Sequence, residues 1–479
     1  MLELNPFRKN KINLEDYDYQ KDIQNRLLMA NLTEKDSQVL EELLYGHPKL
    51  SISQLAQDLI LDESEVVAIL SKLAPSELFT IKDHTISLNK EMRKYFEAQL
   101  QKFDEDFIPG MEYLQSLLRK VSFNCLLTWY PIPRTSNNIF ESLVEKYLLT
   151  PQIFQRYLIE LHFPDPKMSA IIEEVYNAQD FILSGAYIKN KYDLSDAAFE
   201  ELLLNLEFNF VCCLVYKKEG SRWVQYVQPF HEWREYLKFI KESKPLPVEH
   251  ESSIVSLRES DFAFVEDLAE IYKLVKKQAL ALQLNQQEEW VADKVSMKEI
   301  LKKLPAFDEQ LSLEQVHSYV NKIIKKLVFL NLCKIENSCL TTDQAFDEWF
   351  CLSLENRALA IYKQTLSKIE IFNYSPEIAT ERNVREIEKS LGSVVHQGWV
   401  EFEDFLRSVT ASIRKESKIT LKKQGKNWKY TIPVYTPEEL QLIKQTILEW
   451  LFESGLVSVG YFDDKLFFRV TPFGQTLFS

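Results

Sequence analysis

The stretch that decides the fold is Ser51–Asn89, SISQLAQDLILDESEVVAILSKLAPSELFTIKDHTISLN. Ser51 and Asp62 are each followed three residues later by Gln or Glu, which is the capping-box spacing that begins a helix. Residues 79–88 then alternate apolar and polar side chains on either side of a polar tip. The stretch therefore predicts two short helices followed by a compact β-hairpin.

The same order of elements recurs three more times along the chain. Comparable patterns of capped helices and a hairpin occupy residues 194–227, 296–340 and 436–470. A helix pair followed by a two-stranded hairpin is the outline of a winged helix. Because one such unit buries little surface, several units in series are expected to dock on each other. The predicted fold class is therefore mainly α with short β-hairpins (α+β), with tandem winged-helix units in an elongated array.

Breaks between these patterns divide the chain into seven segments. They are an irregular acidic lead-in (1–32), a first winged helix (33–103), a helical segment that is a candidate degenerate winged helix (104–164), a winged helix with a long hairpin (165–240), a linker (241–256), a further winged helix (257–368) and a C-terminal winged helix with a basic hairpin (369–479). The linker assignment rests on Pro245 and Pro247 among charged residues without apolar periodicity. Whether 104–164 is a true repeat stays open.

The composition indicates a chain that folds by burying apolar cores. Of its 479 residues 46% are hydrophobic, whereas only 10 are glycine and 17 are proline, so we expect several cores and few disordered tracts. The first residues lack an apolar core behind a basic flank, and no apolar stretch approaches the ~20 residues that span a bilayer. We therefore expect a cytoplasmic protein with no membrane partner.

The cysteines indicate neither disulfides nor a metal site. Six cysteines are scattered without a CxxC pair or a matching histidine pair. Cys212 and Cys213 are adjacent in an expected strand, where neighbouring side chains point to opposite faces. We expect buried, reduced thiols and neither a metal nor another cofactor.

Signatures of the common catalytic sites are missing from the sequence. A phosphate-binding loop needs GxxxxGK[ST], but Gly425-Lys426 is followed by Asn427 and has Thr420 where the first glycine belongs. His231-Glu232 has Glu235 in place of the second histidine of a zinc protease motif, and no GxSxG elbow occurs. The sequence therefore predicts no catalytic residues, and a protein that is not an enzyme.

One basic stretch stands out against a formal net charge of −14. Its basic and aromatic members, the candidates for nucleic-acid binding, are Arg414, Lys415, Lys418, Lys422, Lys423, Lys426, Trp428 and Lys429. The turn residues 424–427 within it predict a hairpin, whose lysines would lie along phosphates while Trp428 stacks on an exposed base. The alternative is a solvated hairpin whose charges keep an exposed edge from aggregating.

A second candidate surface is the helix expected after Ser312. Lys322, Lys325 and Lys326 recur at i, i+3 and i+4 and would position phosphates from one helix face. The alternative is an ordinary amphipathic helix with a lysine-rich outer face. The corresponding helices of the two earlier units begin with acidic residues, including Glu200, which would repel a groove. Those two units are expected to bind protein or to pack on their neighbours.

Short sequence motifs in the second half of the chain resemble those of a known family. They are Leu340-Thr341-Thr342 with Trp349 and Arg357, Gly398-Trp399-Val400, Gly455-Leu456-Val457 and Arg469-Val470-Thr471-Pro472-Phe473-Gly474. Together they resemble the bacterial helicase-associated winged-helix regions found beside XPB-type helicase motors and as free-standing proteins. The resemblance covers the chain from the linker onwards, marks 257–368 as helicase-associated, and implies a DNA-related accessory role in a bacterial cell. The chain departs from this pattern by lacking a motor and by its acidic balance.

Two functions are compatible with these observations. The first is a non-catalytic accessory protein that binds duplex or forked DNA weakly and without sequence specificity, in transcription or in DNA repair and remodelling. A helicase or a transcription or repair protein would be a further partner. The second is a protein–protein interaction scaffold of winged-helix units that makes no nucleic-acid contact. The sequence leaves both functions open, together with the oligomeric state.

Overall fold

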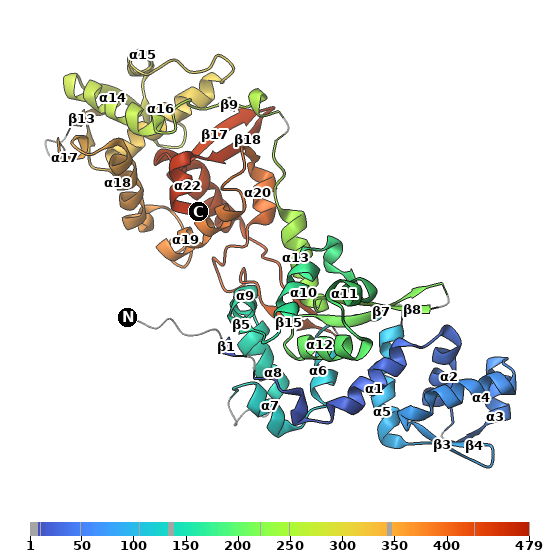
Figure 1. The fold of residues 1–479 in the computed structure, drawn as a ribbon. Coiled ribbons are helices and arrows are strands. Elements are labelled where there is room, and N and C mark those ends of the chain that lie inside the picture. Colours follow the sequence, from blue (N-terminus) through green and yellow to red (C-terminus); the bar gives the residue numbers. More distant parts are fainter. Residues whose placement is uncertain are drawn as a thin grey trace. The chain divides into compact units, whose positions relative to one another are not determined.

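Two compact units make up the chain in the computed structural model (Figure 1). The residues that it describes are 8–9, 11–47, 49–104, 106–132, 138–220, 222–248, 250–342, 347–425 and 427–478. Unit 1 consists of Met1–Phe239 with Thr420–Thr431, and unit 2 of Ile240–Ile419 with Ile432–Ser479. Both units are α+β, because helices dominate and nearly all strands form small antiparallel sheets. In the described part of the chain, no helix is both long and apolar enough to cross a membrane.

Unit 1 is built from short helices and narrow sheets. Its helices are α1 (Tyr19–Ala30), α2 (Glu34–Tyr45), α3 (Ile52–Leu59), α4 (Glu63–Leu73), α5 (Lys90–Leu100), α6 (Met111–Leu118), α7 (Phe123–Trp129), α8 (Ile139–Leu143), α9 (Pro151–Glu160), α10 (Pro166–Asn177), α11 (Gly185–Tyr192), α12 (Asp196–Phe208) and most of α13 (His231–Ser243). Its strands are β1 (Arg8–Lys9), β2 (Lys49–Ser51), β3 (Phe79–Lys82), β4 (Thr85–Leu88), β5 (Leu161–His162), β6 (Leu183–Ser184), β7 (Cys213–Glu219), β8 (Arg222–Gln228), β15 (Leu421–Gln424) and β16 (Asn427–Tyr430).

Two sheets of unit 1 share one topology. Their strand orders are β2-β4-β3 and β6-β8-β7, so that a hairpin pairs through its second strand with a strand that precedes two helices. The order of elements is helix, strand, helix, helix, hairpin from α2 to β4 and again from α10 to β8. The segment 104–164 differs, since it contains the helices α6 to α9 and, among its described residues, only β5, which pairs in parallel with β1.

Local sequence explains where the helices of the first repeat begin. The Ser51 side chain accepts a hydrogen bond from Gln54 N at 3.2 Å and begins α3, as predicted. Asp62 is the N-cap residue of α4, as predicted, but the predicted capping box does not form, because its side chain makes no capping hydrogen bond. Glu65, the expected second member of that box, instead pairs with Lys35 Nζ at 2.5 Å.

The prediction of an irregular lead-in at residues 1–32 is wrong for α1. This helix has twelve residues, and its Ile23 and Arg26 side chains are buried. Arg26 Nε and Nη1 donate hydrogen bonds to Glu200 and Glu207 of α12 at 2.7 and 2.8 Å. The sequence pattern does not predict this helix, because the segment is polar. Its stabilising contacts are made with residues 174 and 181 positions further along the chain than Arg26.

Unit 2 has longer helices around two four-stranded sheets. Its helices are α14 (Ala263–Lys277), α15 (Lys294–Leu301), α16 (Leu313–Phe329), α17 (Asp347–Phe350), α18 (Leu354–Ser367), α19 (Glu381–Ser390), α20 (Phe402–Ser408), α21 (Pro437–Gln445), the π-helical turn η9 (Thr446–Leu451) and α22 (Pro472–Phe478). Its strands are β9 (Val255–Ser256), β10 (Leu280–Leu284), β11 (Trp290–Ala292), β12 (Cys333–Glu336), β13 (Cys339–Thr342), β14 (Val400–Glu401), β17 (Val457–Phe462) and β18 (Lys465–Val470).

The topology of unit 1 recurs twice in unit 2. The strand orders β11-β10-β13-β12 and β14-β18-β17-β9 again join the second strand of a hairpin to an earlier strand. In both cases two helices lie between that earlier strand and the hairpin, but β11 also follows β10, and β15 and β16 of unit 1 lie between α20 and α21. Residues 241–256, predicted as a linker, include the end of α13 and also β9, which pairs with β17 at the edge of the last sheet.

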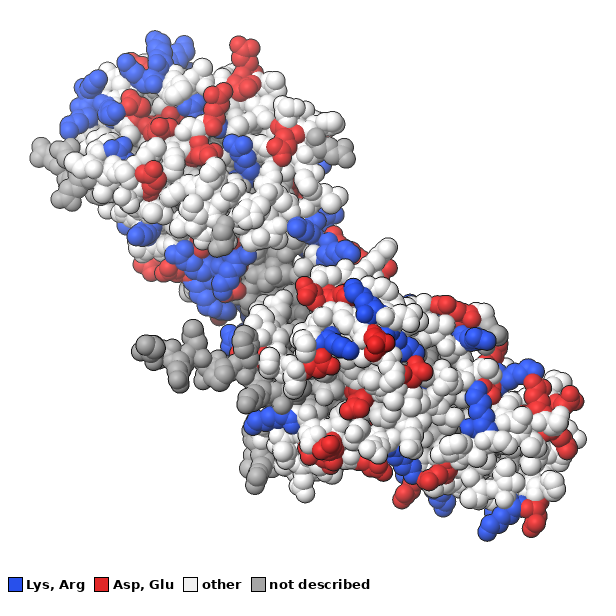
Figure 2. All heavy atoms as spheres, viewed as in Figure 1, with Lys and Arg blue, Asp and Glu red and all other residues white. Residues whose placement is uncertain are grey.

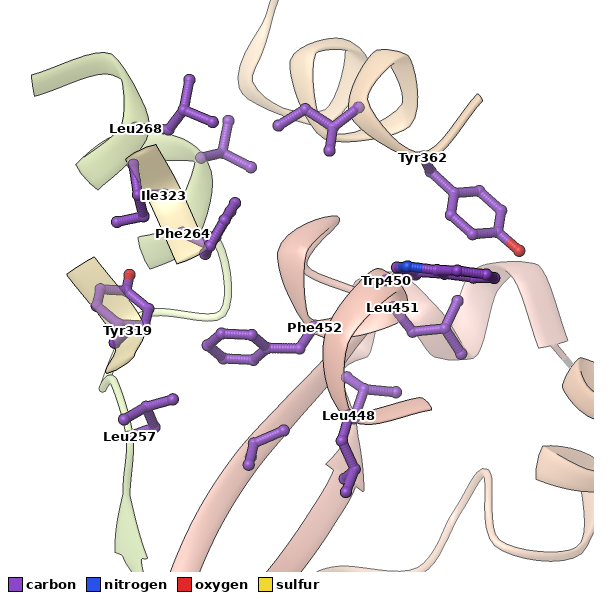
Figure 3. Packing of buried hydrophobic residues seen from close by; sticks show 14 of the residues in the cluster. Leu257, Phe264, Leu268, Tyr319, Ile323, Tyr362, Leu448, Trp450, Leu451 and Phe452 are labelled. Atoms are coloured by element: carbon purple, nitrogen blue, oxygen red, sulfur yellow. The ribbon is translucent and has the colours of Figure 1, made fainter. Parts of the chain in front are cut away.

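Each unit has its own apolar core. In unit 2, Figure 3 shows Phe452 pointing toward Tyr319 and Leu257, while Trp450 lies beside Tyr362. The Phe452 and Tyr319 rings are 6.2 Å apart, so the segment after η9 packs directly on α16. The predicted capping boxes at the starts of α16 and α21 are confirmed, and they fix where these two helices begin.

Candidate functional site

The three candidate lysines lie on α16, as predicted, but each is paired with a glutamate of unit 2. The pairs are Lys322–Glu449 at 2.8 Å, Lys325–Glu289 at 2.7 Å and Lys326–Glu453. Because the positive charges are offset by carboxylates, this helix offers little net charge to a phosphate backbone. The sequence located the lysines correctly and missed their partners.

Lys326 is the most enclosed of the three. Its side chain is 6% exposed and that of Glu453 is 8% exposed, and Lys326 Nζ also donates a hydrogen bond to Thr365 Oγ1 at 3.0 Å. Burial raises the pKa of Glu453 above its ordinary value, while the nearby ammonium acts in the opposite direction. The burial of Lys326 contradicts its prediction as a phosphate-binding residue.

The corresponding helix of unit 1, α12, is also internal. Eight of its 13 residues are buried, including Glu200 at 1% and Glu207 at 0% exposure. Both carboxylates bind Arg26, whose side chain is 2% exposed. Glu200 is therefore not available to a groove, because this residue holds α12 against α1.

The basic hairpin forms as predicted, and it lies in unit 1. Strand β15 pairs with β16 around a two-residue turn in which Gly425 has φ +64°. Leu421 N donates a hydrogen bond to Leu149 O at 2.8 Å, and Tyr430 Oη donates one to Leu148 O at 2.7 Å. The hairpin is thus anchored on unit 1 and forms a separate two-stranded sheet, not a wing of the C-terminal sheet.

The pairing register divides the hairpin side chains between two faces. Lys423 and Trp428 are opposite each other on the anchored face, where Lys423 Nζ lies 3.5 Å from a Glu112 oxygen. Lys422 and Lys429 are opposite each other on the second face, and both are exposed. Like charges directly across a strand pair are destabilising, so Lys422 and Lys429 form the part of the stretch most suited to an anion.

The remaining candidates precede the hairpin or lie at its tip. Arg414 Nη2 lies 3.2 Å from Glu438, while Lys415 and Lys418 are exposed. These three residues belong to unit 2, and the hairpin belongs to unit 1. Lys426 lies outside the described residues. The stretch that the sequence presented as one basic surface is therefore divided between two units.

Figure 2 shows a mixed charge on the face that it draws. On unit 1, basic and acidic side chains are interspersed, and on unit 2, groups of basic side chains stand beside acidic ones. The ion pairs of α16 agree with this picture.

A cavity of about 330 Å³ lies in unit 1 beside the hairpin. Its acidic and aromatic lining residues are Asp104, Asp106, Phe107, Glu112, Glu232 and Trp428.

Glu232 on α13 is 4% exposed, and its Oε1 accepts a hydrogen bond from Met111 N at 2.8 Å. Its Oε2 is buried without a hydrogen-bond partner among the described residues. In the sequence, Glu232 is notable only as part of an incomplete zinc motif. A second signal that could have identified it is its position beside Trp233 and Tyr236 on the buried face of α13.

Glu232 should make stability depend on pH. Burial raises the pKa of Glu232 from 4.5 to about 7, with a smaller contribution from Glu112, while the Met111 N–H acts in the opposite direction. His231 also lines the cavity, and Lys423 of β15 partly offsets Glu112. Because the folded protein holds this proton more tightly than the unfolded chain, its contribution to stability is present below pH 4.5 and is lost as the pH rises through about 7.

Glu232→Gln should therefore become stabilising relative to the wild type as the pH rises. We expect the difference in free energy of unfolding between the two proteins to change by about 3 kcal/mol from pH 4 to pH 8. Denaturant unfolding at the two pH values measures it. A difference independent of pH would contradict the assignment of this titration to Glu232.

Among the described residues, no three His, Cys, Asp or Glu side chains are placed so that they could hold a metal ion. No disulfide joins the described cysteines, and Cys212 and Cys213 are buried. Comparison with models of protein families and with curated proteins gives no match for this sequence.

Proposed function

We propose that the protein is a non-catalytic scaffold of winged-helix units that binds a partner protein. The repeated topology supports the winged-helix part of this proposal. Four times, the second strand of a hairpin pairs with an earlier strand, and two helices lie between them in the chain. The order is uninterrupted in unit 1, whereas in unit 2 β11 follows β10 and the β15–β16 hairpin separates α20 from α21. A helix-turn-helix closed by such a hairpin is the winged-helix arrangement.

The position of the second helix in each repeat carries the choice of partner. In a DNA-binding helix-turn-helix this helix enters the major groove with its N-terminal residues against the bases. Here α12 and α16 occupy that position and are tied into their units through Arg26, Glu449 and Glu453. Of the other two, α4 begins with Glu63, whose charge repels phosphate, and α21 begins with Pro437, followed by Glu438, which pairs with Arg414. A protein surface is the ligand that fits these constraints.

The resemblance to helicase-associated regions supports a DNA-related setting. The partner that we propose is accordingly a helicase or a transcription or repair protein of a bacterial cell. Some of the residues that carry the resemblance have structural roles: Thr471 Oγ1 donates a hydrogen bond to Gly455 O at 2.7 Å, and a Cβ on Gly474 would clash with Leu456 O. These contacts stabilise the last repeat.

Co-purification with and without nuclease tests this proposal. The full-length tagged chain, isolated from its own cells after cross-linking, should carry one partner in constant stoichiometry. Nuclease treatment before cross-linking should leave that stoichiometry unchanged, because the contact is between proteins. A partner that disappears with nuclease, or recovery of nucleic acid alone, would contradict the scaffold.

Weak DNA binding through the hairpin is the second candidate function, favoured by the exposed pair Lys422 and Lys429. If this pair meets phosphates, Lys422→Ala/Lys429→Ala should weaken binding to a labelled duplex at low salt and lower the salt slope by about 2. Lys423→Ala is the matched control from the anchored face and should change neither. Equal losses in both variants would exclude a specific role for the outer face.

A further inference from the structure

The cavity beside the hairpin has the electrostatics of a cation-binding site. Four carboxylates line it, and Lys423 is the cation that the described residues place against one of them, at 3.5 Å from Glu112. Asp104 lies near Asp106, and burial together with this neighbour raises the pKa of Asp104 above its ordinary value. Like charges held together in this way are relieved when a cation arrives.

The aromatic part of the lining suits a flat cation. Trp428 and Phe107 line the same cavity, and the indole of Trp428 is held edge-on against Phe140, with ring centroids 5.9 Å apart and an interplanar angle of 78°. Because β16 is anchored through Tyr430, the indole is fixed before a ligand arrives. A guanidinium group stacks on an indole and binds a carboxylate with two parallel hydrogen bonds. An ammonium group is less suited to both interactions.

The buried carboxylate shows that the cavity is built and is more than a cluster of surface acids. Glu232 is 96% enclosed, since only 4% of its surface is exposed, and its Oε2 has no hydrogen-bond partner among the described residues. The carboxylate rests against the backbone of Gly110, where a Cβ would lie 2.5 Å from Glu232 Oε1. Glycine at this position therefore permits the approach, and Met111 N orients the group. A buried carboxylate oxygen without a hydrogen-bond partner destabilises the folded protein unless a donor group binds it.

We propose that this cavity is the site for an arginine side chain of a partner protein, with the guanidinium between Glu232 and Trp428. The surrounding carboxylates Asp104, Asp106 and Glu112 attract the guanidinium group. This inference rests on the proposed function in one respect only, that a partner polypeptide supplies the arginine.

Ligand-observed NMR on the isolated full-length chain tests the site without a partner. The probe is N-acetyl-arginine methylamide, and N-acetyl-citrulline methylamide is its neutral isostere. We expect saturation transfer to the arginine probe and none to citrulline. Glu232→Gln should weaken binding of the arginine probe about tenfold, the effect of losing a charge-assisted hydrogen bond. Lys423→Gln should strengthen it, because Glu112 then loses its competing cation.

Glu235→Gln is the matched control, since Glu235 is an exposed residue of the same helix that pairs with Lys238. It should leave the affinity unchanged. Equal binding of citrulline, absence of probe binding, or equal affinities of the Glu232→Gln variant and the wild type would overturn the inference. These results come from the isolated chain, whereas failure of the scaffold proposal appears in co-purification, so the two failures are distinguishable.

Discussion

Replacing Arg26 with methionine is expected to lower the free energy of unfolding of unit 1 by about 3–5 kcal/mol. The change removes the partner of Glu200 and Glu207, which are 1% and 0% exposed. Lys102, itself buried so deeply that its pKa falls to about 8, does not replace the guanidinium fork. Native-state hydrogen exchange on the full chain measures the loss, because peptides of unit 1 report on that unit separately.

Arg93→Met is the matched control for this prediction. Arg93 pairs with Glu97 on the surface, with side chains 29% and 35% exposed, so its loss should change stability by less than about 1 kcal/mol. Adding Glu200→Gln and Glu207→Gln to Arg26→Met should recover part of the stability, because the two buried carboxylates are then neutral. The recovery should be incomplete, because the buried Lys102 loses the attraction of Glu207. Equal effects of Arg26→Met and Arg93→Met would contradict the buried network.

Lys326→Met is expected to destabilise unit 2 by about 3 kcal/mol, because it leaves Glu453 buried without a counter-ion. Lys325→Met, one residue earlier on α16, removes an exposed pair with Glu289 and should change stability by less than about 1 kcal/mol. Exchange protection of α16 peptides measures both effects. If Lys326→Met instead left stability unchanged and lowered affinity for DNA, the internal role of this lysine would be contradicted.

Local signals in the sequence predicted much of the secondary structure. The caps at Ser51, Ser312 and Thr436 and the hairpin at 421–430 are confirmed, because each depends on neighbouring residues. The capping box predicted at Asp62 does not form, because the Asp62 side chain makes no capping hydrogen bond. Helix α1 was not predicted, because its stability depends on buried ion pairs with residues that are distant along the sequence.

The candidate site was predicted less well, because pairing is a property of the folded chain. Spacing placed three lysines on α16 but gave no sign of Glu449 and Glu453, which lie 127 residues further along the chain from Lys322 and Lys326. The docking of Tyr430 on Leu148 joins residues 282 positions apart. One signal was available: Glu200 and Glu207 are seven residues apart in a leucine-rich run, and so share a helix face, which is buried.

The central claim is that α12 and α16, the second helices of their repeats, are used for internal packing. Fluorescence anisotropy with a labelled fork across a salt series tests it most directly, on the intact protein and on Lys322→Ala/Lys325→Ala. We predict superimposable curves, with dissociation constants weaker than about 10⁻⁶ M at physiological salt. A clear loss of affinity in the variant, with the salt slope reduced by about 2 and exchange protection unchanged, would show that α16 contacts phosphates and would contradict the account.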